Sequence, residues 1–249
     1  GIRFGLHSSN FIHKVLGTSK MESFTKTLRT ISKNKTPNWS PTMPKAISIN
    51  LNFEQKDSDK KIVYFPSCIN RTMGLNSISK EDKELFDITV ELLQKAGYQI
   101  IFPQNLPNLC CGMPFSSKGF NEAFAFTANQ TIAKLWQCTQ EGKLPVVLDI
   151  TACTHTLHDC RPVLTTENKK YFDGLIILDS INYIADYILP NTKVIAKKPT
   201  IALHPVCSLY KMGLSLKFVE IAKQLAVQVE VPMHSGCCGM AGERGFLYP

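Results

Sequence analysis

One four-residue pattern, Cys-Cys-Gly-Met, occurs twice in this chain, at residues 110–113 and 237–240. Two adjacent thiolates are poorly suited to one tetrahedral zinc ion, whose paired ligands are usually separated by about two to four residues. They suit a polynuclear metal site better, because each sulfur can then bind a different metal atom. The glycine that follows lets the backbone turn and approach a bulky inorganic group. The two copies therefore predict metal or redox sites.

Further cysteines end the apolar segments around these copies. Residues 61–68 and 200–207 each end in Pro-x-Cys, and residues 145–153 form a third apolar segment that ends in a cysteine. The sequence thus predicts two sets of metal ligands. The first set is Cys68, Cys110, Cys111 and Cys153, and the second is Cys207, Cys237 and Cys238. No catalytic residue is predicted.

Short strands and helices in alternation must position these thiols. The predicted strand segments are 61–68, 98–102, 145–153, 200–207 and 227–231, and the predicted helices are 80–96, 121–137 and 216–226. The predicted fold class is α/β, with two pseudo-symmetric lobes, each a small, mostly parallel sheet flanked by helices. The cysteine loops would then lie at the carboxyl ends of the strands, where open parallel sheets carry their sites.

The repeat also predicts how the chain is organised. We expect a basic helix and extended linker at 1–60, a first lobe at 61–198 and a second lobe at 199–249. The second lobe ends before a counterpart of Cys153, which predicts that the chain is a fragment of a longer protein. A helix at 21–32 has Phe24, Leu28 and Ile31 on one side. Packing on the protein body or on an upstream domain is the preferred interpretation of this stripe, ahead of binding to an anionic membrane surface.

Other thiols and histidines have weaker interpretations. Cys138 is predicted to be a core residue. Cys160 is also predicted to be a core residue, and a role as a substitute metal ligand is the less favoured alternative. His155, His158, His204 and His234 lie near the thiols in the sequence. For each of them, structural hydrogen bonding is the preferred interpretation. His204 and His234 are the better candidates for contact with the bound group or its ligands. Asn70 and Arg71 fit a role in orienting that group and a solvated loop equally well.

Composition narrows the class of protein. Nine cysteines with no disulfide-type spacing indicate a reducing, cytoplasmic compartment. The apolar runs are far too short to span a membrane. Of the net charge of +8, residues 1–61 carry +7 and residues 62–249 carry +1. The predicted lobes are therefore nearly neutral, which argues against a nucleic-acid-binding core.

The doubled arrangement of Cys, Cys-Cys-Gly and Cys resembles the cysteine-rich (CCG) domain found in heterodisulfide reductase and in the iron-sulfur subunit of glycolate oxidase. Segments 64–74, 203–208 and 236–242 are most similar to the C-terminal part of FAD- and iron-sulfur-dependent D-lactate dehydrogenases. The resemblance covers about residue 61 to the end of the chain. Thr156 stands where heterodisulfide reductase has a further cysteine, which favours a cubane held by four thiolates over a noncubane cluster.

The resemblance implies a function and its cofactors. The two cysteine sets would hold iron-sulfur clusters of the 4Fe-4S type, and an FAD domain and ferredoxin-type domains of the same protein would precede residue 1. Electrons from D-lactate or a related 2-hydroxy acid would pass to a quinone or cytochrome. Membrane contact would be at most peripheral, on the inner face, and no nucleic acid would be bound. Two alternatives are a thiol/disulfide reductase of the heterodisulfide type and a zinc-bound or degenerate interaction domain without catalysis.

Overall fold

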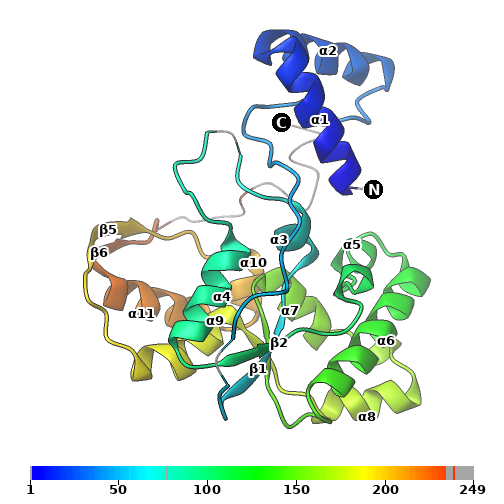
Figure 1. Cartoon of the computed structure of the whole chain (residues 1–249). Coiled ribbons are helices and arrows are strands. Elements are labelled where there is room, and N and C mark those ends of the chain that lie inside the picture. Colours follow the sequence, from blue (N-terminus) through cyan, green and yellow to red (C-terminus); the bar gives the residue numbers. More distant parts are fainter. Residues whose placement is uncertain (1, 56, 77, 234–237, 239–249) are drawn as a thin grey trace. The chain divides into compact units, whose positions relative to one another are not determined.

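A computed structural model describes residues 2–55, 57–76, 78–233 and 238. The chain divides into two compact units (Figure 1). Unit 1 comprises residues 1–50, 69–88 and 238–249, and unit 2 comprises residues 51–68 and 89–237. Along the part of the chain that is described, no helix is both long and apolar enough to cross a membrane.

Unit 1 begins with two helices, α1 (Ile2–Leu16) and α2 (Thr18–Ile31), which pack on each other. Helix α2 corresponds to the helix predicted at 21–32. Helix α1 was not predicted, because its Gly, Ser and Asn residues are weak helix formers. The buried Trp39 follows this pair, and its indole ring lies 4.3 Å from the ring of His13. After Trp39 the chain is largely irregular, apart from an antiparallel bridge between Ala46 and Met73.

Unit 2 is built on a four-stranded parallel sheet. Its strands are β1 (Lys61–Phe65), β2 (Gln99–Ile101), β3 (Val146–Leu148) and β4 (Ile177–Asp179), in the spatial order β2-β1-β3-β4. Tyr64 of β1 is in register with Val147 of β3. These two central strands are buried along nearly their whole length, which is why they are almost continuous runs of apolar residues.

The second repeat forms a two-stranded parallel sheet of β5 (Lys198–Ala202) and β6 (Ala226–Glu230). Both strands are largely exposed, in contrast to β1 and β3. Small parallel sheets flanked by helices confirm the predicted α/β fold class.

Helices connect the strands of both sheets. They are α3 (Cys68–Thr72), α4 (Leu85–Lys95), α5 (Met113–Ser116), α6 (Asn121–Cys138), α7 (Thr151–His158), α8 (Thr166–Gly174), α9 (Ser180–Tyr183), α10 (Cys207–Lys211) and α11 (Ser215–Leu225). Shorter helical turns are η1 (Leu106–Asn108), η2 (Arg161–Val163), η3 (Ile184–Ile188) and η4 (Leu189–Asn191). In Figure 1, α6 and α8 lie on one side of the first sheet and α9 and α11 on the other.

The largest error in a predicted helix boundary is at the start of α4. Helix α4 begins at Leu85 and not at residue 80. Glu84 explains the late start, because both of its carboxylate oxygens accept the backbone N–H of Leu75, at 3.1 and 2.9 Å. The side chain that would have stood in the first turns of a longer helix therefore closes the preceding loop.

Candidate metal centre

The strand order reverses between β1 and β3. From β1 the chain crosses to β2 on one side, and it then returns over β1 to β3 on the other side. Such a reversal is a topological switch point, and open α/β sheets bind ligands there, beyond the carboxyl ends of the strands. The loops that leave β1 and β3 at this point carry Cys68 and Cys153.

Both of these cysteines begin a helix. Cys68 is the first residue of α3, three residues after β1 ends, and Cys153 lies in the first turn of α7, where its N–H donates to the carbonyl of Ile150 at 2.9 Å. Cys153 is buried, and Cys68 is partly exposed. The sequence-predicted thiols of the first and third segments are thus delivered to one edge of the sheet.

A carboxylate that the sequence interpretation missed joins these two loops. Asp149 directly follows β3, and its Oδ1 accepts the N–H of Ser67 at 2.9 Å. Its Oδ2 accepts the hydroxyl of Tyr64 at 2.7 Å. Tyr64 and Ser67 belong to the segment that delivers Cys68, so one side chain links the ends of β1 and β3.

The vicinal pair reaches the same place from a different element. Thr131 on α6 donates its hydroxyl to the carbonyl of Cys110 at 2.8 Å. The N–H of Gly112 points back to the Cys110 sulfur at 3.4 Å. Gly112 has φ +86°, which places it in the left-handed region, and the ring of Phe124 packs where a Cβ would stand. The loop is thereby held against α6, and α5 starts directly after it.

Three of the four predicted thiols are in contact. Hydrogen bonding to Cys110 and then to Cys153, together with burial, raises the pKa of Cys111 far above its usual range. Cys111 and Cys153 are buried, and Cys110 is partly exposed. The structure therefore brings Cys110, Cys111 and Cys153 together, with Cys68 at the end of the neighbouring strand. Over the described ranges, no group of three or more His, Cys, Asp or Glu side chains is arranged to hold a single metal ion.

The second predicted set is described only in part. Cys207 is exposed and is the first residue of α10, the same position that Cys68 has in α3. Cys238 is also exposed. Cys237 and His234 lie outside the described residues. His204 is exposed in the loop between β5 and α10. Helix α10 packs on α7, the helix that carries Cys153.

The remaining thiols do not join either set. Cys138 is partly exposed near the end of α6, and its thiol donates to the carbonyl of Leu135 at 3.3 Å. Cys160 is fully buried just beyond α7. Burial raises the pKa of both thiols to about 12. Cys160 therefore has the environment predicted for a core residue, whereas Cys138 is less buried than predicted.

A second buried carboxylate holds α7 from the side of β4. Asp179 ends β4, and its Oδ2 accepts the hydroxyl of Thr154 at 2.9 Å, while its Oδ1 accepts the N–H of Ile181 at 3.0 Å. Burial raises the pKa of Asp179 above its usual range, and these hydrogen bonds oppose the shift. Thr154 directly follows Cys153, so Asp179 fixes the turn of α7 that carries this thiol.

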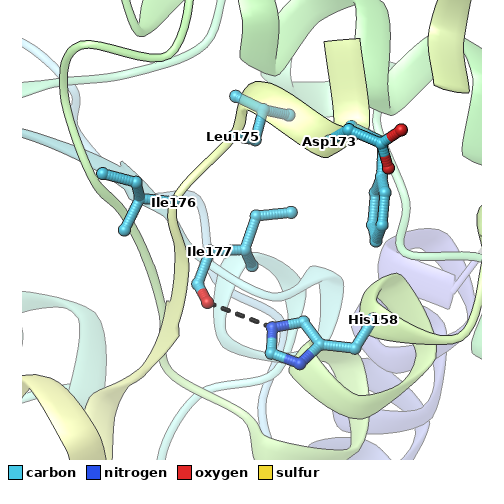
Figure 2. Close-up of a pocket in the computed structure, with 6 residues that line it drawn as sticks. His158, Asp173, Leu175, Ile176 and Ile177 are labelled. Carbon is cyan, nitrogen blue, oxygen red and sulfur yellow. Dashed lines mark hydrogen bonds between the residues drawn. The ribbon is translucent and has the colours of Figure 1, made fainter. Parts of the chain in front are cut away.

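Neither histidine of α7 is engaged with the thiols. The Nε2 of His158 lies 3.0 Å from the carbonyl oxygen of Ile177, at an open cavity of about 560 Å³ (Figure 2). The described lining of this cavity is His158, Phe172, Asp173, Leu175, Ile176 and Ile177, which contains no cysteine. His155 pairs with Asp159, with Nδ1 and Oδ2 3.0 Å apart. The two rings have the structural role that the sequence interpretation preferred for each of them.

These features define a class: a cysteine-rich α/β domain whose thiols gather at the switch point of a parallel sheet. Residues 62–158 match the family model of the cysteine-rich domain known as CCG. This range runs from β1 to the end of α7 and includes the four thiols of the first set. The first repeat is therefore similar to the CCG cysteine-rich domain, which confirms the predicted resemblance to that domain.

Comparison with curated proteins gives two kinds of relative. One is a subunit of anaerobic glycerol-3-phosphate dehydrogenase from Escherichia coli (strain K12), which is 27% identical over 144 residues that cover 55% of this chain and 35% of that subunit. The other is lactate utilization protein A from Macrococcus caseolyticus (strain JCSC5402), which is 25% identical over 190 residues that cover 73% of this chain and 71% of that protein. This chain thus matches only 35% of the length of the glycerol-3-phosphate dehydrogenase subunit.

Proposed function

We propose that this chain is an iron-sulfur electron-transfer region of an oxidoreductase. The observation that carries the proposal is the contact of Cys110, Cys111 and Cys153 at the switch point, with Cys68 on the adjacent loop. Thiolates are the ligands that iron-sulfur clusters use, and four suffice for a cubane. Such a cluster supplies one-electron storage and transfer. The protein's part is to hold the four sulfurs together, with Cys111 and Cys153 buried and Cys68 and Cys110 partly exposed.

The finer proposal concerns the reaction. We infer that the electrons come from D-lactate or a related 2-hydroxy acid by way of an FAD domain upstream in the same protein, and that they pass to a quinone or cytochrome. The similarity to lactate utilization protein A over 73% of this chain supports a hydroxy-acid substrate. The similarity to a glycerol-3-phosphate dehydrogenase subunit supports an oxidoreductase with partner domains or subunits. We further propose a cytoplasmic location with membrane contact at most peripheral.

Iron loading tests the proposal directly. The chain is reconstituted anaerobically with iron and sulfide, and iron, acid-labile sulfide and the visible absorption of the cluster are measured. In wild type we expect cluster absorption that bleaches on reduction. Cys111→Ala removes a ligand and is expected to lose most of the iron of the first site, because a missing ligand destabilises the metal and the loops that bind it.

Cys138→Ala is the matched control, because it removes a partly buried thiol on α6 outside the cluster. It should load as wild type does. Wild-type protein without iron, or a Cys111→Ala variant that loads like Cys138→Ala, would contradict the proposal. Reversible two-electron oxidation of the thiols without iron would instead support the alternative function, a thiol/disulfide reductase. The same three contacting sulfurs could form its redox-active thiols.

A further inference from the structure

The side chain of Asp149 accepts two hydrogen bonds from the segment that leads to Cys68, one from a side chain and one from a backbone amide. The phenol of Tyr64 comes from within β1, and the N–H of Ser67 comes from the residue directly before Cys68. Tyr64 is 0% exposed and Ser67 is 3% exposed, so both donors are buried. Hydrogen bonds to a charged acceptor are stronger than bonds between neutral groups. Loss of the carboxylate would remove the shared acceptor of both donors.

The register of the sheet explains why this side chain reaches both. Phe65 of β1 pairs with Leu148 of β3, so Asp149 is the first residue beyond the paired part of β3. Asp149 lies four residues before Cys153 in its own loop. Its side chain faces the neighbouring segment, which leads from β1 to Cys68. A phenol and an amide carry no positive charge, so neither partner neutralises the carboxylate.

We propose that Asp149 is a positioning residue for the metal centre: it holds the Cys68 loop and the Cys153 loop in mutual register. The inference rests on the proposed function for its role toward a cluster, but the fixing of the two loops is a property of the protein without metal. Asp149 acts through the loops and need not touch the cluster. A negative charge near such a centre also disfavours an added electron and lowers the reduction potential.

The first test uses the full chain without metal. The rate at which an alkylating reagent modifies Cys153 is followed by mass spectrometry of its peptide in wild type, Asp149→Ala, Asp149→Asn, Tyr64→Phe and Asp173→Asn. Asp173 pairs with Arg161 on the surface and is the matched control. We expect modification in Asp149→Ala to be at least about tenfold faster, which corresponds to about 1.4 kcal/mol of lost protection. Asp173→Asn should react as wild type does. Tyr64→Phe removes one of the two donors, so its modification rate should lie between those of wild type and Asp149→Ala. This variant replaces Asp149→Ala in the test if the alanine variant does not fold.

The second test uses reconstituted protein. The chelator concentration that removes half of the iron should be about tenfold lower in Asp149→Ala, the size of effect typical of residues that orient metal ligands. Asp149→Asn keeps an acceptor oxygen but loses the charge, so its cluster should be retained better and have a more positive reduction potential. A purely structural residue would not move the potential.

The outcomes separate the two proposals. If wild type binds no iron, the proposed function fails, and the alkylation rates still decide whether Asp149 fixes the loops. If wild type binds iron but Asp149→Ala matches Asp173→Asn in alkylation and in chelator resistance, the positioning role is overturned. An unchanged potential in Asp149→Asn, with cluster retention equal to that of Asp173→Asn, would overturn it as well.

Discussion

Gly112 lies between Cys111 and α5 and is closely packed against Phe124. Its φ of +86° disfavours any residue with a Cβ, and a Cβ built there would meet Cδ2 of Phe124 at 2.6 Å. A left-handed conformation costs an L-residue about 1–2 kcal/mol. Two separate effects, backbone strain and crowding by Phe124, therefore act at this position.

Substitution of Gly112 by alanine should reveal both effects. We expect Gly112→Ala to lower the free energy of unfolding by more than the about 1–2 kcal/mol that backbone strain alone costs. Gly119→Ala is the control, because Gly119 has φ +76° but nothing within 4 Å of its Cβ position. Urea denaturation measures both variants. Equal losses of stability would mean that contact with Phe124 contributes nothing.

At this scale the sequence singled out the thiols but not the side chains that hold their loops. Cys110 and Cys111 were recognised because their adjacency is rare in itself, and no structure was needed. Asp149, Tyr64 and Thr131 were missed because their partners are distant in the sequence. The Tyr64 and Asp149 pair is separated by 85 residues, and a lone tyrosine in an apolar strand resembles any core residue. Such pairs become visible only once the strand order is known.

Among the elements, α7 is tied to β4, because Asp179 at the end of that strand accepts the hydroxyl of Thr154. Asp149, at the end of β3, instead ties the loop before α7 to the segment that follows β1. The apolar segments predicted the positions of β1, β2, β3, β5 and β6 but not that of the short strand β4, and the sequence also favoured parallel pairing. The order β2-β1-β3-β4 could not be predicted, because apolar runs of similar length and composition do not encode which of them are neighbours.

Asp179 makes stability depend on pH in a definite direction. Its pKa in the folded protein is raised by burial, so the folded state binds this proton more tightly than the unfolded state does. That contribution to stability is fully present below the ordinary aspartate pKa and is lost as pH rises through the higher folded-state pKa. Asp179→Asn can still accept the N–H of Ile181 but does not titrate, so its stability does not fall for this reason as pH rises.

We therefore expect the stability of Asp179→Asn relative to wild type to improve as pH rises from about 4 toward 7, across the upper side of the ordinary aspartate range. Urea midpoints at a series of pH values measure this difference. A difference that stays constant, or that changes in the opposite direction, would contradict the raised pKa. Asp173→Asn provides the comparison, because the guanidinium of Arg161 lowers the pKa of Asp173 and the sign of its pH dependence is opposite.

For the whole molecule, the division into two units predicts unequal stability. Across the described part of residues 2–50, the buried apolar side chains are Met21 and Trp39, whereas Phe4, Phe11 and Ile31 are exposed. Unit 2 instead contains the buried strands β1 and β3. Because burial of apolar surface is the main source of folding free energy, unit 1 should be the less stable of the two.

The two tryptophans allow this to be measured, since Trp39 lies in unit 1 and Trp136 lies in unit 2. Trp136→Phe leaves Trp39 as the reporter, and Trp39→Phe leaves Trp136, which stacks on Tyr171. We expect the fluorescence of Trp39 to change at a lower urea concentration than that of Trp136. Superimposable curves would show that the units unfold as one.

The anchoring of the four thiols has a consequence for how a cluster would be received. The loops of Cys68 and Cys153 are bound to the sheet through Asp149 and Asp179. The Cys110–Cys111 turn is attached to α6 by the hydroxyl of Thr131. Each of the loops that would receive a cluster is therefore held in place by the protein itself, without help from the metal.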